Sequence, residues 1–70
     1  MQRLGAKVRT LRKQRGMTLK ELALTLGFSS HSYVSEIETG KKQPTTEMII
    51  KIADVFGVTV DVLVRDELDV

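Results

Sequence analysis

Apolar residues recur at helical spacing along most of the chain, and this pattern predicts a bundle of helices. Leu4, Val8 and Leu11 are separated by four and then three positions, which places them on one face of a helix. Similar stripes recur after Gly16 and each later glycine, and glycine readily ends a helix in left-handed backbone. The predicted helices cover about residues 2–14, 18–26, 31–38, 45–56 and 60–65. The sequence therefore predicts an all-α fold of five helices.

Several polar residues stand where helix ends are expected. Thr18 and Glu21 have the spacing of a capping box, in which each side chain accepts a hydrogen bond from the other residue's backbone N–H. The other expected caps are Ser29 or Ser30, Thr45 and Thr59. Gly5 lies inside the first helix, where glycine costs about 1 kcal/mol relative to alanine. We expect Gly5 to allow close packing of this helix.

The last apolar segment, Val58 to Val64, can be interpreted in two ways. Its alternation, VTVDVLV, is also the pattern of a half-buried strand. We favour a short helix that begins after Thr59, with Val60 and Leu63 facing inward. A strand in this segment is the alternative.

Length and composition limit the possible classes of protein. Seventy residues predict one domain, residues 1–70, and no apolar run approaches the roughly 18 residues of a membrane span. Cysteine is absent, which excludes disulfides and thiolate metal ligands and fits a cytoplasmic protein. His31 is the single histidine and has no companions at metal-ligand spacing. We expect neither a metal nor another cofactor.

The sequence contains no arrangement of residues that predicts catalysis. It has no Ser-His-Asp or Cys-His arrangement, no paired carboxylates that form a cleft, and no glycine-rich loop that would cradle a phosphate. We therefore expect a protein that is not an enzyme.

Charge is distributed unevenly along the chain, although the net charge is only +2. Residues 1–20 hold seven cations and no acid, whereas residues 43–70 hold two cations and six acids. Such an asymmetry predicts a basic front and an acidic back, which would orient the domain on a polyanion. The alternative is that these charges only form solvated helix faces and an acidic tail.

The stretch from Thr18 to Pro44 predicts two short helices joined by a tight turn at Gly27 and followed by a basic loop. Val34 and Ile37 are three positions apart and share the inner face of the second of these helices. The residues then expected to point away from the core are Ser30, His31, Ser32, Tyr33, Ser35 and Glu36. A face of small hydrogen-bonding side chains beside Lys41 and Lys42 suits a DNA major groove.

Motifs in four of the predicted helices resemble one known family. The segments LRKQRGMTLKELALTLGF and YVSEIETGKKQPTTEMIIKIADVFGVTVDVL are similar to the phage-repressor and Cro type of helix-turn-helix protein, the XRE family, from about Val8 to Val64. The resemblance implies a compact five-helix domain, usually dimeric, whose second and third helices form the helix-turn-helix. The third helix of such a domain enters the major groove.

The resemblance also implies a function. We expect sequence-specific binding to double-stranded DNA and transcriptional regulation, most simply repression, by a homodimer on a palindromic operator. The alternative is a protein-interaction module, such as the antitoxin or adaptor partner of another protein, with DNA binding secondary.

The resemblance assigns contacts to particular side chains. Base contacts are expected from Ser30, His31, Ser32, Tyr33 and Glu36. Phosphate contacts are expected from Thr18, Lys20, Ser35, Thr39, Lys41, Lys42 and Gln43. Serine can pair with several bases, histidine can donate to guanine, and glutamate can accept from the amino group of cytosine. Lysines neutralise phosphates and contribute affinity without sequence information.

Two positions depart from the family's usual pattern. Leu19 stands where the family often has a glutamine that contacts phosphate, so Thr18 or Lys20 would anchor this helix end instead. The spacing from Gly27 to Ile37 is one residue longer than usual, which leaves the start of the third helix open.

Several of the assigned side chains keep an alternative role. Glu36 either reads cytosine or is a solvated carboxylate, and His31 either contacts a base or is only an exposed polar residue. Tyr33 could pack against the protein, bond a phosphate or contact a thymine methyl group.

Two further sets of residues have expected structural roles. The resemblance implies that Arg12 and Glu38 form an ion pair between the first and third helices. Helical periodicity leaves apolar residues exposed near the C-terminus, so the expected dimer interface is formed by Val60, Val62, Val64 and Leu68. Two domains joined there would place their third helices about one DNA turn apart.

Overall fold

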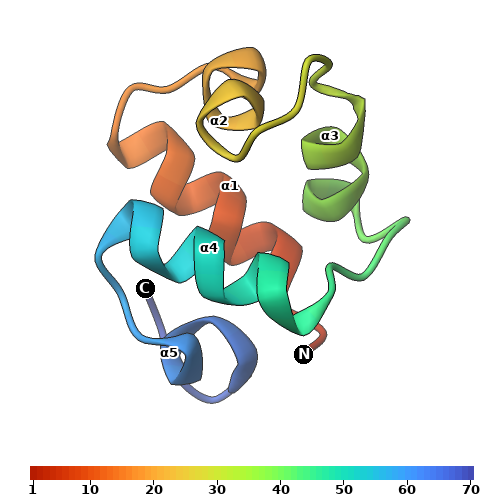
Figure 1. The fold of residues 1–70 in the computed structure, drawn as a ribbon. Helices are drawn as coiled ribbons and strands as arrows, with labels where there is room; N and C mark the ends of the chain where they lie inside the picture. The colour runs from red at the N-terminus through yellow and green to blue at the C-terminus, as the bar shows by residue number, and fades with distance from the viewer.

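Five helices and no strand make up the structure, a computed structural model that describes residues 1–70 (Figure 1). The helices are α1 (Leu4–Gln14), α2 (Leu19–Thr25), α3 (Ser32–Thr39), α4 (Thr46–Phe56) and α5 (Val60–Val64). The predicted all-α fold is confirmed, with helix boundaries within two residues of those expected. The segment that could have formed a strand forms α5 instead. No helix has the length and apolar character needed to cross a membrane.

Every helix contributes to one hydrophobic core. Its buried residues are Leu4, Val8, Leu11, Leu22, Ala23, Leu26, Val34, Ile37, Ile49, Ile52, Ala53, Phe56 and Leu63. The expectation that Val60 faces inward is wrong, because its side chain is 37% exposed. Leu63 and the half-buried Val64 connect α5 to the core instead. In Figure 1 the helices α1 and α4 lie centrally, with α2 above them and α5 below.

The capping box at the start of α2 forms as predicted. The Thr18 hydroxyl oxygen accepts a hydrogen bond from the Glu21 N–H at 3.0 Å, and the Glu21 carboxylate accepts one from the Thr18 N–H at 2.8 Å. The bond from the Thr18 backbone holds the pKa of Glu21 below its usual value. Thr45 and Thr59 cap α4 and α5 in the expected way.

The start of α3 differs from the prediction. Its N-cap residue is His31, whose side chain makes no capping bond, rather than Ser29 or Ser30. The Ser30 hydroxyl oxygen accepts a hydrogen bond from the Ser32 N–H at 3.2 Å, one position before the cap.

Four of the seven cations in residues 1–20 are bound within the fold, so the expected basic front is smaller than the sequence suggested. Lys7 is only 2% exposed, and its ammonium group donates to the carbonyl oxygens of Val62 at 2.8 Å and Arg65 at 2.6 Å. Those carbonyls lie at the end of α5, where a cation is favoured. Arg3 binds the Asp69 carboxylate, Arg12 binds the Glu38 carboxylate, and Arg15 donates to the Phe56 carbonyl oxygen.

The C-terminal segment caps the start of α1. The Asp66 carboxylate accepts hydrogen bonds from the backbone N–H groups of Arg3 at 3.0 Å and Gln2 at 3.1 Å. These bonds hold the pKa of Asp66 below its usual value. The Arg3 side chain makes no capping bond, so Asp66 takes the place of a local cap. The C-terminal segment and the start of α1 therefore stabilise each other.

Gly5 lies where the backbones of α1 and α3 approach each other closely. A Cβ atom at this position would lie 2.8 Å from the carbonyl oxygen of Glu38 and would overlap that of Ile37. Both obstacles are backbone atoms, which cannot turn aside as a flexible side chain could. Only glycine fits, as its place inside the helix suggested.

We predict that Gly5→Ala lowers the free energy of unfolding by about 1–3 kcal/mol, the usual range for overpacking. This loss would occur even though alanine favours a helix by about 1 kcal/mol over glycine. Urea denaturation followed by circular dichroism measures the change. Thr10→Ala, at an exposed position of α1, serves as the control and should not destabilise the protein. A more stable Gly5→Ala protein would contradict the close approach.

Candidate nucleic-acid interface

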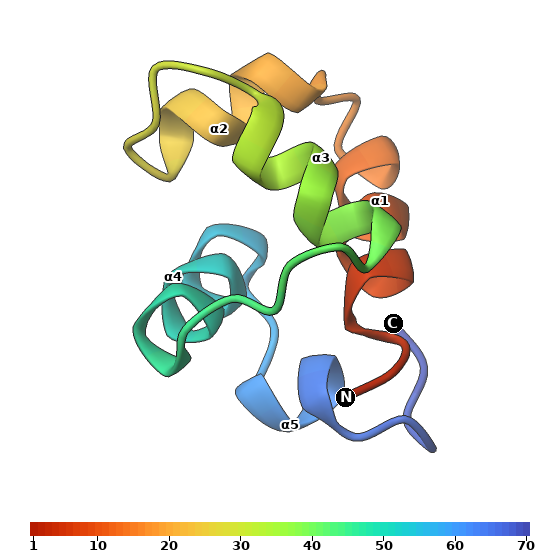
Figure 2. The same cartoon turned by 90° about the vertical axis from the view of Figure 1, so that its right-hand side faces the viewer.

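Helices α2 and α3 form the helix-turn-helix, and Figure 2 views α3 from its outer side with α2 above it. Gly27 has a φ of +95°, which turns the chain out of α2. The Phe28 N–H then donates to the Ala23 carbonyl at 2.8 Å and closes the helix end. The half-buried Phe28 side chain packs against the core.

Four residues of α3 form its outward stripe: Ser32, Ser35, Glu36 and Thr39. Their spacing of three, four and seven positions places them on one face, opposite the buried Val34 and Ile37. Ser32 and Thr39 are exposed, whereas Ser35 and Glu36 are half-buried. The outward stripe offers hydroxyl groups, which can bond with base edges or phosphates, and one carboxylate, which can accept hydrogen bonds from the amino groups of bases.

Tyr33 does not point away from the core, so that part of the prediction is wrong. Its half-buried ring packs against Phe28, with ring centroids 4.7 Å apart. The Lys42 ammonium lies over the Tyr33 ring, 5.8 Å from its centroid. The Tyr33 ring therefore contacts both the turn before α3, at Phe28, and the basic loop after it, at Lys42.

Ser30 and His31 lie in the bend before α3 and are exposed. The Ser30 and Ser32 hydroxyl groups are 3.1 Å apart and bond to each other. The His31 side chain makes no hydrogen bond within the protein. The predicted base contacts of Ser30 and His31 would therefore come from the turn and those of Ser32 and Glu36 from the helix itself.

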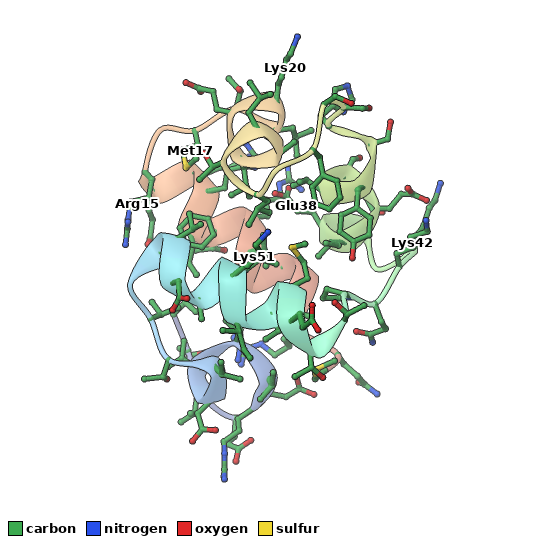
Figure 3. The ribbon with its side chains drawn as sticks, in the orientation of Figure 1. Arg15, Met17, Lys20, Glu38, Lys42 and Lys51 are labelled. Atoms are coloured by element: carbon green, nitrogen blue, oxygen red, sulfur yellow. The ribbon has the colours of Figure 1, made fainter.

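The basic loop after α3 is attached to the helix by its backbone. Gly40 has a φ of +82°, and the N–H groups of Lys41 and Lys42 both donate to the Glu36 carbonyl, at 2.9 and 3.2 Å. The side chains of Lys41, Lys42 and Gln43 are exposed. Lys42 extends away from the body of the protein beside α3 (Figure 3). Two cations are thus held at the C-terminal end of the outward stripe.

The start of α2 presents a second set of predicted phosphate contacts. The Thr18 hydroxyl oxygen accepts the capping bond, which leaves its hydrogen free to donate. Lys20 is exposed and projects outward beyond α2 (Figure 3). Leu19 is half-buried and offers no hydrogen-bonding group.

Arg12 and Glu38 form a bidentate ion pair between α1 and α3. Arg12 Nε lies 2.7 Å from Glu38 Oε2, and Arg12 Nη2 lies 3.1 Å from Glu38 Oε1. Only 11% and 6% of these side chains are exposed, and Glu38 lies in the interior in Figure 3. Arg12 Nη1 also donates to the Met17 carbonyl at 2.8 Å. The bond to Glu38 raises the pKa of Arg12.

The helix-turn-helix family model HTH_3 matches residues 8–63, from within α1 to within α5. The chain belongs to this helix-turn-helix family. The resemblance found in the sequence motifs is therefore confirmed.

Several known proteins are similar to the chain over most of its length. The "ImmF control region 10 kDa protein" of Bacillus phage phi105 is 34% identical over 68 residues, which cover 97% of this chain and 74% of that protein. The uncharacterized HTH-type transcriptional regulator YazB of Bacillus subtilis is 36% identical over 63 residues, 90% of each chain. Among solved structures, the N-terminal DNA-binding domain of SinR from Bacillus subtilis superposes with a TM-score of 0.84 at 29% identity and covers 96% of this chain and 97% of that one.

We predict that Glu38→Ala lowers the free energy of unfolding by about 3–5 kcal/mol, because it leaves the Arg12 charge buried without its partner. Urea denaturation measures the loss. The double variant Arg12→Met/Glu38→Leu, which removes both charges, should recover most of it. A loss below about 1 kcal/mol, the size found for exposed ion pairs, would contradict the structural role of this pair.

Proposed function

We propose that this HTH_3 protein is a transcriptional regulator that binds double-stranded DNA in a sequence-specific way. The outward stripe of α3 carries the proposal, since it presents a continuous row of hydrogen-bonding groups on a helix fixed to a rigid core. An α-helix fits the major groove, where each base pair shows a distinct pattern of donors and acceptors. The family and the named functions of the relatives agree with this role.

In this proposal base edges are contacted mainly by Ser32 and Glu36. Ser32 can pair with several bases, and the Glu36 carboxylate accepts a hydrogen bond from the amino group of cytosine. Ser30 and His31 reach bases from the turn, where the histidine can donate to guanine. Tyr33, half-buried beside the stripe, contributes only at its edge.

Phosphate contacts in this proposal come from both sides of the helix-turn-helix. Lys41, Lys42 and Gln43 lie in the exposed loop after α3, and Thr18 and Lys20 lie at the start of α2. Ser35 adds a free hydroxyl group. Thr39 contributes less as a donor, because its hydroxyl group already donates to the carbonyl oxygens of Ser35 at 3.0 Å and Glu36 at 3.3 Å.

We further propose that two copies of the chain bind a palindromic operator and repress transcription by occluding a promoter. The proposed dimer interface consists of Val60, Val62, Val64 and Leu68. Val60 and Leu68 are each 37% exposed, and Val62 and Val64 are half-buried, so apolar surface remains around α5. A dimer of this kind would present its two recognition helices to successive major grooves, about 34 Å apart.

We predict that Lys42→Ala weakens binding to a similar extent on every DNA sequence and flattens the dependence of log affinity on log salt by about one unit. Lys41→Ala should act in the same way. Fluorescence anisotropy at several salt concentrations measures both effects. Lys13→Ala, which removes the same charge from an exposed position of α1, is the matched control and should leave the slope unchanged. Unchanged slopes in both loop variants would refute these phosphate contacts.

We predict that Ser32→Ala and Glu36→Ala change which base pairs are preferred, with a discrimination of about 1–3 kcal/mol per altered base pair. Both side chains belong to the outward stripe and neither supports the core, so folding should be preserved. Selection of binding sites from a pool of random duplexes compares the preferences of parent and variants. If parent and variants select the same sequences, α3 does not read bases through these residues.

A further inference from the structure

A hollow of about 190 Å³ lies between α1, the start of α2 and α3. It is lined by Arg9, Arg12, Leu19, Ser35, Glu38 and Thr39. Ser35 and Thr39 also belong to the outward stripe, so the hollow opens directly beside the surface proposed to enter the major groove. None of the contacts proposed above involves a side chain of α1.

The hollow carries a net positive charge. Arg12 and Glu38 neutralise each other through their bidentate ion pair. Arg9 is exposed and forms neither an ion pair nor a hydrogen bond through its side chain, so its charge is uncompensated. The Ser35 hydroxyl group is likewise unbonded, whereas the Thr39 hydroxyl donates within α3. Two donors, one of them charged, therefore converge on this space.

We infer that this hollow binds a backbone phosphate of DNA, with the Arg9 guanidinium and the Ser35 hydroxyl as donors. A guanidinium group matches a phosphate geometrically and can donate two parallel hydrogen bonds to it. Leu19 supplies no donor, so the charge of this site comes from α1 alone. The inference rests on the proposed function, because it names a further contact with the same DNA.

The position of the hollow supports a phosphate as the occupant. The outward stripe has Ser35 on the side of the hollow and Glu36 on the side of Tyr33 and the basic loop. A major groove is bordered by one phosphate backbone on each side. A helix lying in the groove would therefore meet one backbone at Lys41 and Lys42 and the opposite one at Arg9. The two sets of contacts would fix the helix across the width of the groove.

The first test compares Arg9→Gln with Lys13→Gln. Lys13 lies one turn further along α1, is exposed and carries the same charge, but does not line the hollow. Anisotropy titrations use a duplex that the parent protein has selected from a random pool. Arg9→Gln should flatten the salt slope by about 0.9 unit, the effect of losing one phosphate contact, whereas Lys13→Gln should leave it unchanged. Neither variant should change the thermal unfolding temperature.

The second test replaces single phosphates of this duplex by uncharged methylphosphonates. Each replacement at a contacted phosphate should weaken binding by the parent protein. At the phosphate held in the hollow, the replacement should not weaken binding by the Arg9→Gln protein any further. The same replacement should weaken binding by the Lys13→Gln protein as much as binding by the parent. Identical patterns for the parent and Arg9→Gln would overturn the inference.

The outcomes separate this inference from the proposed function. If Lys42→Ala weakens binding and Arg9→Gln does not, α3 still binds DNA but the hollow holds no phosphate. If Arg9→Gln and Lys13→Gln flatten the slope equally, Arg9 acts only through the general charge of α1 and the inference is wrong. If the parent protein selects no duplex, both the function and the site are refuted.

Discussion

The buried ion pair between Arg12 and Glu38 fixes α3 to the rest of the molecule, and the geometry of the proposed interface depends on it. Arg12 binds both carboxylate oxygens of Glu38 and the Met17 carbonyl, so one guanidinium joins α1, the start of the helix-turn-helix and the end of α3. Gly5 allows the backbones of α1 and α3 to touch close to the same place. Separating the two groups would leave both charges buried and unpaired, which is costly. The ion pair therefore restricts movement of α3 relative to α1.

The cations of the chain are divided between holding the fold and facing solvent. Lys7 and Arg15 donate to carbonyl oxygens at the ends of α5 and α4, and Lys51 lies 3.5 Å from the Leu26 carbonyl at the end of α2. Each of these side chains satisfies carbonyl groups that a helix leaves without a partner. The exposed cations whose side chains form no hydrogen bond or ion pair within the protein are Arg9, Lys13, Lys20, Lys41 and Lys42. The net charge of +2 therefore says little about the surface that could meet a polyanion.

Local patterns in the sequence predicted the elements well because each pattern acts within a few residues. Helical spacing placed the core stripes, glycines marked the helix ends, and Thr18 with Glu21 gave the start of α2. The ion pair of Arg12 and Glu38 came from the family resemblance rather than from local chemistry. Most of the proposed contact residues are indeed exposed or half-buried around α3.

The features that the sequence did not reveal depend on how separate elements are placed, several of them far apart along the chain. Lys7 lies on the same face as Leu4 and Leu11, but its acceptors are backbone carbonyls more than 50 residues away. Tyr33 packs on Phe28, across the turn that joins α2 to α3. The N-cap of α3 is His31 rather than Ser29 or Ser30, and the helix begins at Ser32. The place of Arg9 in the hollow requires three elements to be positioned together.

The central claim is that α3 reads bases from the major groove. Dimethyl sulfate interference tests it most directly, because the reagent methylates N7 of guanine in the major groove and N3 of adenine in the minor groove. A duplex selected by the protein is lightly methylated, and the bound and free fractions are compared. Methylation of guanine N7 within the site should exclude DNA from the bound fraction, while methylation of adenine N3 should have little effect. Interference at adenine N3 alone, or no interference at all, would contradict the account.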